Sequence, residues 1–239
     1  IQMGMLPKIF PPYPDRNDVD LHAILHPAKE VGGDLYDFYM DDNHLYFLIG
    51  DVSGKGVPAS LFMAITRSLF RTLSQHVLSP AKIVTEMNNS ISDNNESNMF
   101  VTLIVGILDL ETGILKLCNA GHNPPILIYP DGQVSYLEFK TQIFVGVVED
   151  FKYSDEEVVL EKESKLFLYT DGVTEAENIN KELYGEEKLL EMLSDNASSD
   201  VRTTVNVVVD SIASHVKEAE ASDDLTILLI QYEPGTANS

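Results

Sequence analysis

The sequence predicts an α+β fold, an αββα sandwich of two mainly antiparallel β-sheets flanked by helix pairs. Apolar, strand-like runs and amphipathic helices follow one another in blocks: strands, two helices, many strands, two helices and a last strand. Alternating βαβ units would instead predict a parallel sheet. Short turns at 111–113 (ETG) and 130–132 (PDG) join neighbouring strands into antiparallel hairpins. Two sheets packed face to face, with the helices outside, accommodate these blocks economically.

The first part of the chain contains two strands and then two helices. A proline-rich lead-in, "LPKIFPPYPD" (6–15), precedes an alternating strand at 19–26 and a more apolar strand at 44–53. Residues 57–76 form a helix whose buried face we expect to be Leu61, Phe62, Ile65, Leu69, Phe70 and Leu73. Ser79 is the expected N-cap of the next helix, with Pro80 at its first position. The apolar face of that helix is Ile83, Val84, Met87 and Ile91.

The second part is richer in strands. They are expected at 100–110, 114–120, 125–129, 133–139, 156–161, 164–172 and 225–232. Two helices precede the last strand, at about 185–195 and 200–219.

Composition excludes several classes of protein. The formal charge of −22 repels nucleic acid and anionic lipid, so we expect neither as a partner. Cys118 is the only cysteine, which rules out an internal disulfide and a cysteine-based zinc site. A single thiol fits a reducing compartment, so we expect a cytoplasmic domain. No apolar run reaches the ~18 residues of a membrane span.

The stretch "GDVSGKGVPAS" (50–60) resembles a phosphate-binding loop only superficially. Three residues lie between Gly50 and Gly54, whereas a P-loop has four before its Gly-Lys pair. Gly56 also occupies the position where a magnesium-binding Ser or Thr should follow Lys55. The spacing therefore argues against a P-loop and directs attention to Asp51.

Acidic residues occur repeatedly at the ends of apolar strands. Asp34 lies in "EVGGDLYD", Asp51 ends "YFLIGD", Asp171 ends "LFLYTD", and Asp223 and Asp224 precede "LTILLI". Carboxylates gathered at one sheet edge repel each other unless a cation lies among them. Oxygen ligands suit Mg²⁺ or Mn²⁺. The alternative is the ordinary preference of Asp for strand ends and turns.

Five segments together resemble a known family. They are "EVGGDLYDFY" (30–39), "IGDVSGKGVPASLFMA" (49–64), "NAGHNPP" (119–125), "LYTDGVTEA" (168–176) and "DDLTILLI" (223–230). In this order they resemble the PPM-type (protein phosphatase 2C-like) metal-dependent serine/threonine phosphatases, in the SpoIIE/RsbU-like bacterial branch. The resemblance covers about residues 7–233 and implies the two-sheet αββα fold already expected.

The resemblance implies a role for each matching position. Asp51 would bridge two Mn²⁺ or Mg²⁺ ions, with the backbone carbonyl of Val52 as a further ligand. Asp171 would bind one ion, Asp223 the other, and Asp34 would bind directly or through water. A third ion is an open alternative. In the implied mechanism a hydroxide between the ions attacks phosphorus, so no side-chain nucleophile is needed.

Several positions depart from the family pattern or have open roles. Eukaryotic members carry a histidine, the suggested general acid, where this chain has Ser53. Lys29 lies near the position of their phosphate-binding arginine and either holds phosphate as a point charge or is an ordinary surface lysine. Asp37 and Asp224 either support the ligands, bind a third ion weakly, or are solvated. Ser53 is a further candidate for supporting the ligands. We expect His122 to make a structural hydrogen bond in a hairpin turn.

The leading hypothesis is a phosphatase acting on phosphoserine or phosphothreonine. In the SpoIIE/RsbU-like branch the substrate is usually a STAS-domain anti-anti-sigma factor. The alternative is a catalytically weak or degenerate phosphatase-fold module that acts by binding a partner. A nucleotide cyclase is disfavoured because Leu35 and Tyr36 follow Gly32-Gly33-Asp34 where a GGDEF signature has Glu-Phe.

The sequence begins at Ile1, in the middle of a pattern, so we expect a fragment of a longer protein. The expected organisation is a lead-in at 1–14 from an upstream regulatory region, the phosphatase domain at 15–234 and a tail at 235–239. The expected partners are a phosphorylated STAS-type protein and an upstream sensor domain, whose linker could mediate a homodimer. The full-length parent could carry a membrane anchor.

Overall fold

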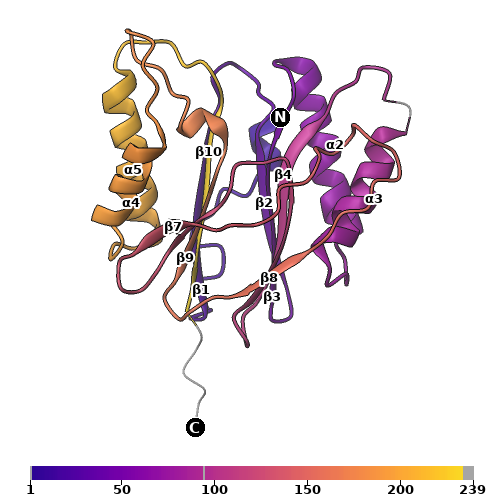
Figure 1. Ribbon diagram of the computed structural model, residues 1–239, viewed down its shortest axis with the longest axis horizontal. Helices are drawn as coiled ribbons and strands as arrows, with labels where there is room; N and C mark the ends of the chain where they lie inside the picture. The colour runs from indigo at the N-terminus through magenta and orange to yellow at the C-terminus, as the bar shows by residue number, and fades with distance from the viewer. Residues whose placement is uncertain (1, 94, 234–239) are drawn as a thin grey trace. The chain divides into compact units, whose positions relative to one another are not determined.

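The computed structural model describes residues 2–93 and 95–233, and the chain divides into two compact units (Figure 1). The first unit comprises Ile1–Pro7, Lys29–Pro124 and Glu138–Val159. The second comprises Lys8–Ala28, Pro125–Leu137 and Leu160–Ser239. Each unit contains one five-stranded antiparallel sheet and one pair of long helices. The predicted α+β class and the two antiparallel sheets are therefore confirmed.

The sheet of the first unit has the strand order β2-β3-β4-β5-β8. Its strands are β2 (Leu35–Asp41), β3 (His44–Val52), β4 (Val101–Asp109), β5 (Ile114–Ala120) and β8 (Glu156–Val159). The helices α2 (Val57–Leu73) and α3 (Pro80–Ser92) pack on this sheet, and the short α1 (Gln2–Met5) lies against α2. Residues 45–49 of β3 are almost fully buried, so this strand is the centre of the unit.

The start of α3 is built as the sequence predicts. The Ser79 hydroxyl accepts a hydrogen bond from the Lys82 amide at 3.3 Å, and Pro80 occupies the first helical turn. Asp155 accepts further hydrogen bonds from the Ser79 hydroxyl, at 2.6 Å, and from the Ala81 amide. The apolar face expected for this helix, from Ile83 to Ile91, is buried.

The buried face of α2 differs from the expected one. The helix buries Ala59, Met63, Thr66 and Phe70. Leu61 and Ile65, which we expected inside, are 62% and 54% exposed. This helix has apolar residues on nearly every side, so periodicity alone does not select the face. Ion pairs between Asp37 of β2 and two arginines of α2, Arg67 and Arg71, fix the orientation instead.

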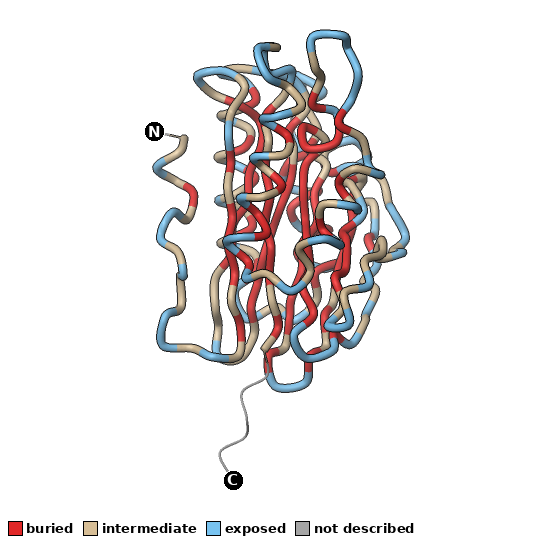
Figure 2. Tube along the Cα trace, turned by 90° about the vertical axis from the view of Figure 1, so that its left-hand side faces the viewer, coloured by how far each residue is buried: buried red, intermediate tan, exposed pale blue. Residues whose placement is uncertain are grey.

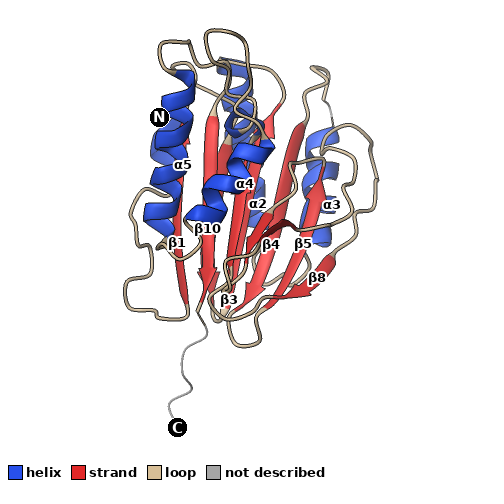
Figure 3. Ribbon diagram, turned by 60° about the vertical axis from the view of Figure 1, so that its left-hand side comes forward, coloured by secondary structure: helices blue, strands red, loops and turns tan. Residues whose placement is uncertain are grey.

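The sheet of the second unit has the strand order β1-β10-β9-β6-β7. Its strands are β1 (Val19–His26), β6 (Ile126–Ile128), β7 (Val134–Tyr136), β9 (Lys165–Tyr169) and β10 (Leu225–Tyr232). The helices α4 (Glu186–Asp195) and α5 (Val201–Val216) pack together, and α5 contacts β1 and β10 (Figure 3). A short 3₁₀ turn, η1 (Asp171–Val173), follows β9.

Burial is concentrated on the central strands, which appear red along most of their length in Figure 2. In the second unit the inner faces of α4 and α5 meet the sheet in a single apolar cluster. Its members include Phe167, Leu189, Val205, Val208, Ile227 and Leu229.

One strand, β2, is missing from the sequence-based prediction. Its sequence "LYDFYMD" places the charged Asp37 among apolar residues, which hides the alternation of a strand. The other strands and the four long helices lie where they were expected, within a few residues at their ends. No helix in residues 2–93 and 95–233 is long and apolar enough to cross a membrane. The expected tail, 235–239, lies outside the described residues.

Candidate active site

Strand register in the first unit places two of the predicted ligands opposite each other. In the antiparallel pair β2–β3, Leu35 is opposite Gly50. The preceding residue, Asp34, is therefore next to Asp51 at the end of the sheet. Asp34 is buried, with 2% exposure, and Asp51 is half-buried. Hydrogen-bonded pairing holds this end of β3 against β4, where Asp51 is opposite Thr102.

Gly33 allows the two strands to approach closely at this point. A Cβ atom at Gly33 would lie 2.7 Å from the Val52 carbonyl oxygen and 3.4 Å from Oδ1 of Asp51. Any other residue would thus press on the carbonyl that the family resemblance assigns to a metal ion. The missing side chain leaves space beside the oxygen atoms of Asp51 and Val52, and these hard oxygen donors fit Mg²⁺ or Mn²⁺.

The segment after Asp51 turns directly into α2. Gly54 and Gly56 have φ angles of 88° and 76°, which glycine adopts without strain. Gly50 lies within β3 and not in this turn. There a Cβ atom would come within 2.8 Å of the Thr102 carbonyl oxygen, so close packing explains this glycine. The Ser53 hydroxyl accepts a hydrogen bond from the Phe100 amide at 2.9 Å.

Asp37 is neither solvated nor near the surface. Its side chain is completely buried and forms ion pairs with two arginines of α2. Arg71 donates from Nε and Nη2 to the two carboxylate oxygens, each at 2.6 Å, and Arg67 Nε lies 3.0 Å from Oδ2. This arrangement ties α2 to β2 three residues after Asp34. The solvated alternative for Asp37 is therefore wrong.

His122 makes the structural hydrogen bonds expected of it. Its Nδ1 lies 2.9 Å from the Thr102 hydroxyl, and its amide donates to Asn119 Oδ1 at 2.8 Å. The Asn119 side-chain amide donates in turn to the His122 carbonyl at 3.0 Å. Since Thr102 is opposite Asp51, this buried network supports the end of β3.

In the second unit two other predicted ligands lie on adjacent segments. Asp171 opens the turn η1 after β9, and Asp223 lies just before β10. A Cβ atom at Gly172 would overlap the backbone carbonyl of Asp224, so these two segments are in direct contact. The Thr226 amide also donates to the Thr170 hydroxyl at 3.1 Å. Asp171 and Asp223 are both half-buried.

Asp224 is mainly a structural residue. It is buried, and its Oδ1 accepts a hydrogen bond from the Ala28 amide at 2.9 Å. This contact fastens the end of β1 to the start of β10. Asp223 Oδ1 accepts a hydrogen bond from the Asp224 amide at 3.0 Å, which helps to orient the Asp223 carboxylate.

Two further observations concern the predicted site residues. Lys29 is exposed. In the described part of the chain, no group of three or more His, Cys, Asp or Glu side chains is gathered as a metal site. The assignments of Asp34, Asp51, Val52, Asp171 and Asp223 as ligands therefore stay predictions. The sequence alone did not reveal the close approach at Gly33 or the arginine partners of Asp37.

The comparisons with known proteins agree on one family. Residues 41–233 match the family described as "Stage II sporulation protein E (SpoIIE)". The chain is 27% identical to phosphoserine phosphatase RsbU of Bacillus subtilis, over 91% of this chain and 64% of that protein. It spans less than two thirds of the length of the curated relatives it matches.

Solved structures show the same fold. The SiaA-PP2C domain of Pseudomonas aeruginosa superposes with a TM-score of 0.80 at 22% identity, over 89% of this chain and 86% of that one. RsbX, solved in complex with magnesium, gives a TM-score of 0.69 at 19% identity, over 91% of this chain and 97% of that one. With the family match over most of its length, the chain belongs to the SpoIIE family, and it has the fold of PP2C domains.

Proposed function

We propose that this domain is a metal-dependent protein phosphatase that hydrolyses phosphoserine or phosphothreonine on a regulatory protein. The observation that carries the proposal is the β2–β3 register, which sets Asp34 beside Asp51 next to the space left by Gly33. Asp171 and Asp223 complete the proposed ligand set, on two segments of the second unit that touch each other.

The proposed division of labour follows from these residues. Asp51, Asp34 and the Val52 carbonyl would hold divalent cations in the first unit, and Asp171 and Asp223 would hold them in the second. When bound, two Mn²⁺ or Mg²⁺ ions supply an activated water and neutralise charge on the phosphoryl oxygens. Ser53 occupies the position of the histidine that is the suggested general acid in eukaryotic members, so we assign the protonation of the leaving serine to water. Lys29 would attract the phosphate as a point charge.

The proposed substrate is a phosphorylated STAS-domain protein. Two observations support a regulatory protein of this kind: the similarity to phosphoserine phosphatase RsbU, and a solved relative that contains RsbU and RsbW domains. The share of the curated relatives that lies outside the matched region leaves room for an upstream sensor domain in the parent protein.

The direct experiment measures hydrolysis of p-nitrophenyl phosphate and of a phosphoserine protein with and without Mn²⁺. We expect activity that a chelator abolishes and that Asp51→Asn or Asp171→Asn reduces to background. Circular dichroism should show that both variants remain folded. Glu161→Gln, at an exposed position, is the matched control and should keep full activity.

Two outcomes would count against the proposal. Activity that survives chelation would exclude the metal mechanism. A folded wild-type protein that binds its partner but turns over neither substrate would favour the alternative, a degenerate module acting by partner binding.

A further inference from the structure

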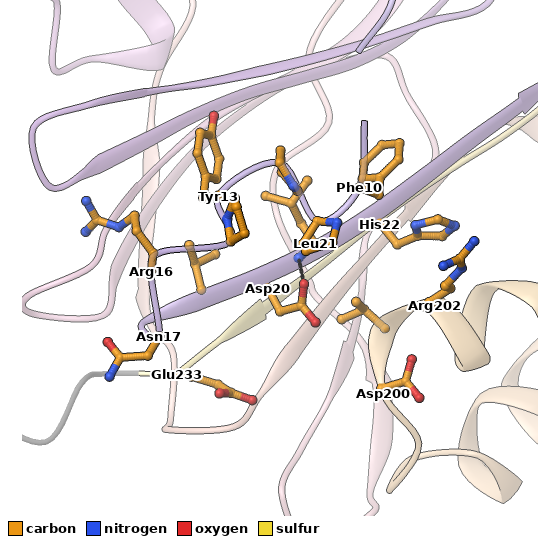
Figure 4. Close-up of a pocket in the computed structure, with 15 residues that line it drawn as sticks. Phe10, Tyr13, Arg16, Asn17, Asp20, Leu21, His22, Asp200, Arg202 and Glu233 are labelled. Atoms are coloured by element: carbon orange, nitrogen blue, oxygen red, sulfur yellow. Dashed lines mark hydrogen bonds between the residues drawn. The ribbon is translucent and has the colours of Figure 1, made fainter. Parts of the chain in front are cut away.

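A pocket of about 440 Å³ lies in the second unit, where the lead-in meets β1 (Figure 4). Its lining comes from residues 10–14, 16 and 17, the first half of β1, the start of α5 and Glu233 after β10. Small-molecule sites in proteins typically enclose roughly 300–1,000 Å³. The pocket is thus large enough for a small ligand.

One wall of the pocket is apolar and stiff. It consists of Phe10, Tyr13 and the prolines of the lead-in, Pro11, Pro12 and Pro14. Proline fixes its own backbone φ angle, so this wall is largely set before a ligand arrives. The ring of Phe10 packs edge-on against His22 of β1, with 4.7 Å between ring centroids.

The opposite side of the pocket carries an excess of carboxylates. Asp20, Asp200 and Glu233 all line it. Burial raises the pKa of Asp20, and the nearby negative charge of Asp200 adds to that rise. Of the two arginines in the lining, Arg16 is held by Asp18, with 2.8 Å between Nε and Oδ1. Arg202, the other one, carries a single positive charge against three carboxylates. The remaining charge of the lining is therefore negative, and the two aspartates repel each other.

The side chain of His22 is a second feature of the pocket that indicates a ligand, independently of these charges. The residue is 8% exposed and lines the pocket, and its ring nitrogens make no hydrogen bond to the described residues. Burial and the positive charge of Arg202 lower the pKa of this imidazole, so the ring is neutral near pH 7. A neutral imidazole offers one donor and one acceptor to a ligand in the pocket.

The pocket is far from the predicted metal ligands of the same unit. Asp223 precedes β10, whereas Glu233 follows it. A strand of this length spans about 26 Å at roughly 3.3 Å per residue. A ligand in the pocket would therefore occupy a separate site and not the phosphate position.

We propose that this pocket binds a small organic cation, a protonated amine or guanidinium on an apolar body. The charged group would lie between Asp20 and Asp200, where it would relieve their repulsion. The His22 ring would accept a hydrogen bond from the ligand, and the apolar body would pack on Phe10 and the prolines. Aromatic rings beside carboxylates favour organic cations in general.

The test compares three probes of one shape and different charge. Benzylamine, benzyl alcohol and benzoate are titrated into the domain at pH 7 while its amide NMR signals are recorded. We expect benzylamine to bind roughly tenfold or more tightly than benzyl alcohol, because hydrogen bonds to charged groups are the stronger ones. The shifted signals should belong to residues 10–22 and 200–202.

Variants assign the binding to the pocket. Asp20→Asn should remove the preference for benzylamine, and His22→Phe should weaken binding while keeping the fold. Glu161→Gln, exposed in the same unit, is the control and should bind as the wild type does. Melting curves of all variants establish that loss of binding is not loss of fold.

Several results would overturn the proposal. Equal binding of the three probes, absence of any binding, or full benzylamine binding by a folded Asp20→Asn variant would each do so. Tighter binding of a blocked arginine tripeptide than of benzylamine would show that the pocket takes a protein side chain and not a small molecule.

Discussion

Gly33 is a single position on which the geometry of the proposed site depends. In Gly33→Ala the new methyl group would press on the Val52 carbonyl, 2.7 Å away. We expect the strand ends to separate, which should lower Mn²⁺ affinity and cost about 1–3 kcal/mol of stability, as overpacking does. Isothermal titration with Mn²⁺ and urea denaturation measure the two effects.

Gly4→Ala is the matched control for this substitution. Nothing lies within 4 Å of a Cβ atom at Gly4, so alanine there should leave Mn²⁺ affinity unchanged. It should not lower stability, because Gly4 lies in a helix, where alanine is the more favourable residue. Unchanged Mn²⁺ affinity in Gly33→Ala would show that the close approach does not matter for metal binding.

Substitution of Lys29 tests whether this side chain contacts the phosphate. If this exposed lysine holds phosphate, Lys29→Ala should lower kcat/KM roughly tenfold or more, since one charged hydrogen bond contributes about 1.5–3 kcal/mol. Mn²⁺ affinity should stay the same. Lys140→Ala, at another exposed position of the first unit, should leave kcat/KM as it is. Identical kinetics for the two variants would make Lys29 an ordinary surface residue.

Among the helices and strands, the ion pairs of Asp37 with Arg67 and Arg71 orient α2 against β2. Asp37→Asn would leave Arg67 and Arg71 facing a neutral amide in a buried setting. Breaking a buried pair in this way costs about 3–5 kcal/mol. Urea denaturation should show a loss of this order for Asp37→Asn.

An exposed ion pair provides the comparison. Lys181 lies 2.7 Å from Glu177 on the surface, and Lys181→Met should leave stability unchanged within error. Equal midpoints of unfolding for the two variants would mean that the Asp37 contacts do not orient α2.

The same ion pairs explain which features of the helices and strands could not be predicted from the sequence. Strand and helix positions follow from hydrophobic periodicity and turn residues, as at α3 with Ser79 and Pro80. The buried face of α2 and the existence of β2 depend on a charge buried by partners distant in sequence. No local pattern contains that information. Leu61 and Ile65 were therefore placed inside although they face outward.

Part of the candidate site could likewise be predicted from the sequence. The motifs placed Asp51 and Asp171 at the ends of buried strands. In the structure Asp51 is the last but one residue of β3, and Asp171 follows the end of β9 by two positions. Strand pairing is not local, so the position of Asp34 opposite Asp51 could come only from the structure. The structural role of Asp224 depends on the Ala28 amide, which lies nearly two hundred positions away in the chain.

For the whole molecule, the formal charge of −22 should shape the choice of substrate. A phosphopeptide flanked by arginines should have a higher kcat/KM than one flanked by glutamates, because the field of the protein steers cations toward it. Raising the ionic strength to about 0.5 M should shrink the difference, since screening shortens the range of such fields to a few ångströms. Faster turnover of the acidic peptide at low salt would contradict this.

The pairing of β1 with β10 affects the order in which the two units can fold during synthesis. Val19 is opposite Tyr232, so two neighbouring strands of one sheet lie near opposite ends of the chain. On a ribosome, β1 emerges well before β10 and must wait for all the elements between them before its partner exists. Contacts so distant in sequence slow folding and leave strand edges exposed in the meantime. We therefore expect the second unit to complete its fold only after β10 has been synthesised, while the β2–β3–β4–β5 sheet can assemble earlier from consecutive strands.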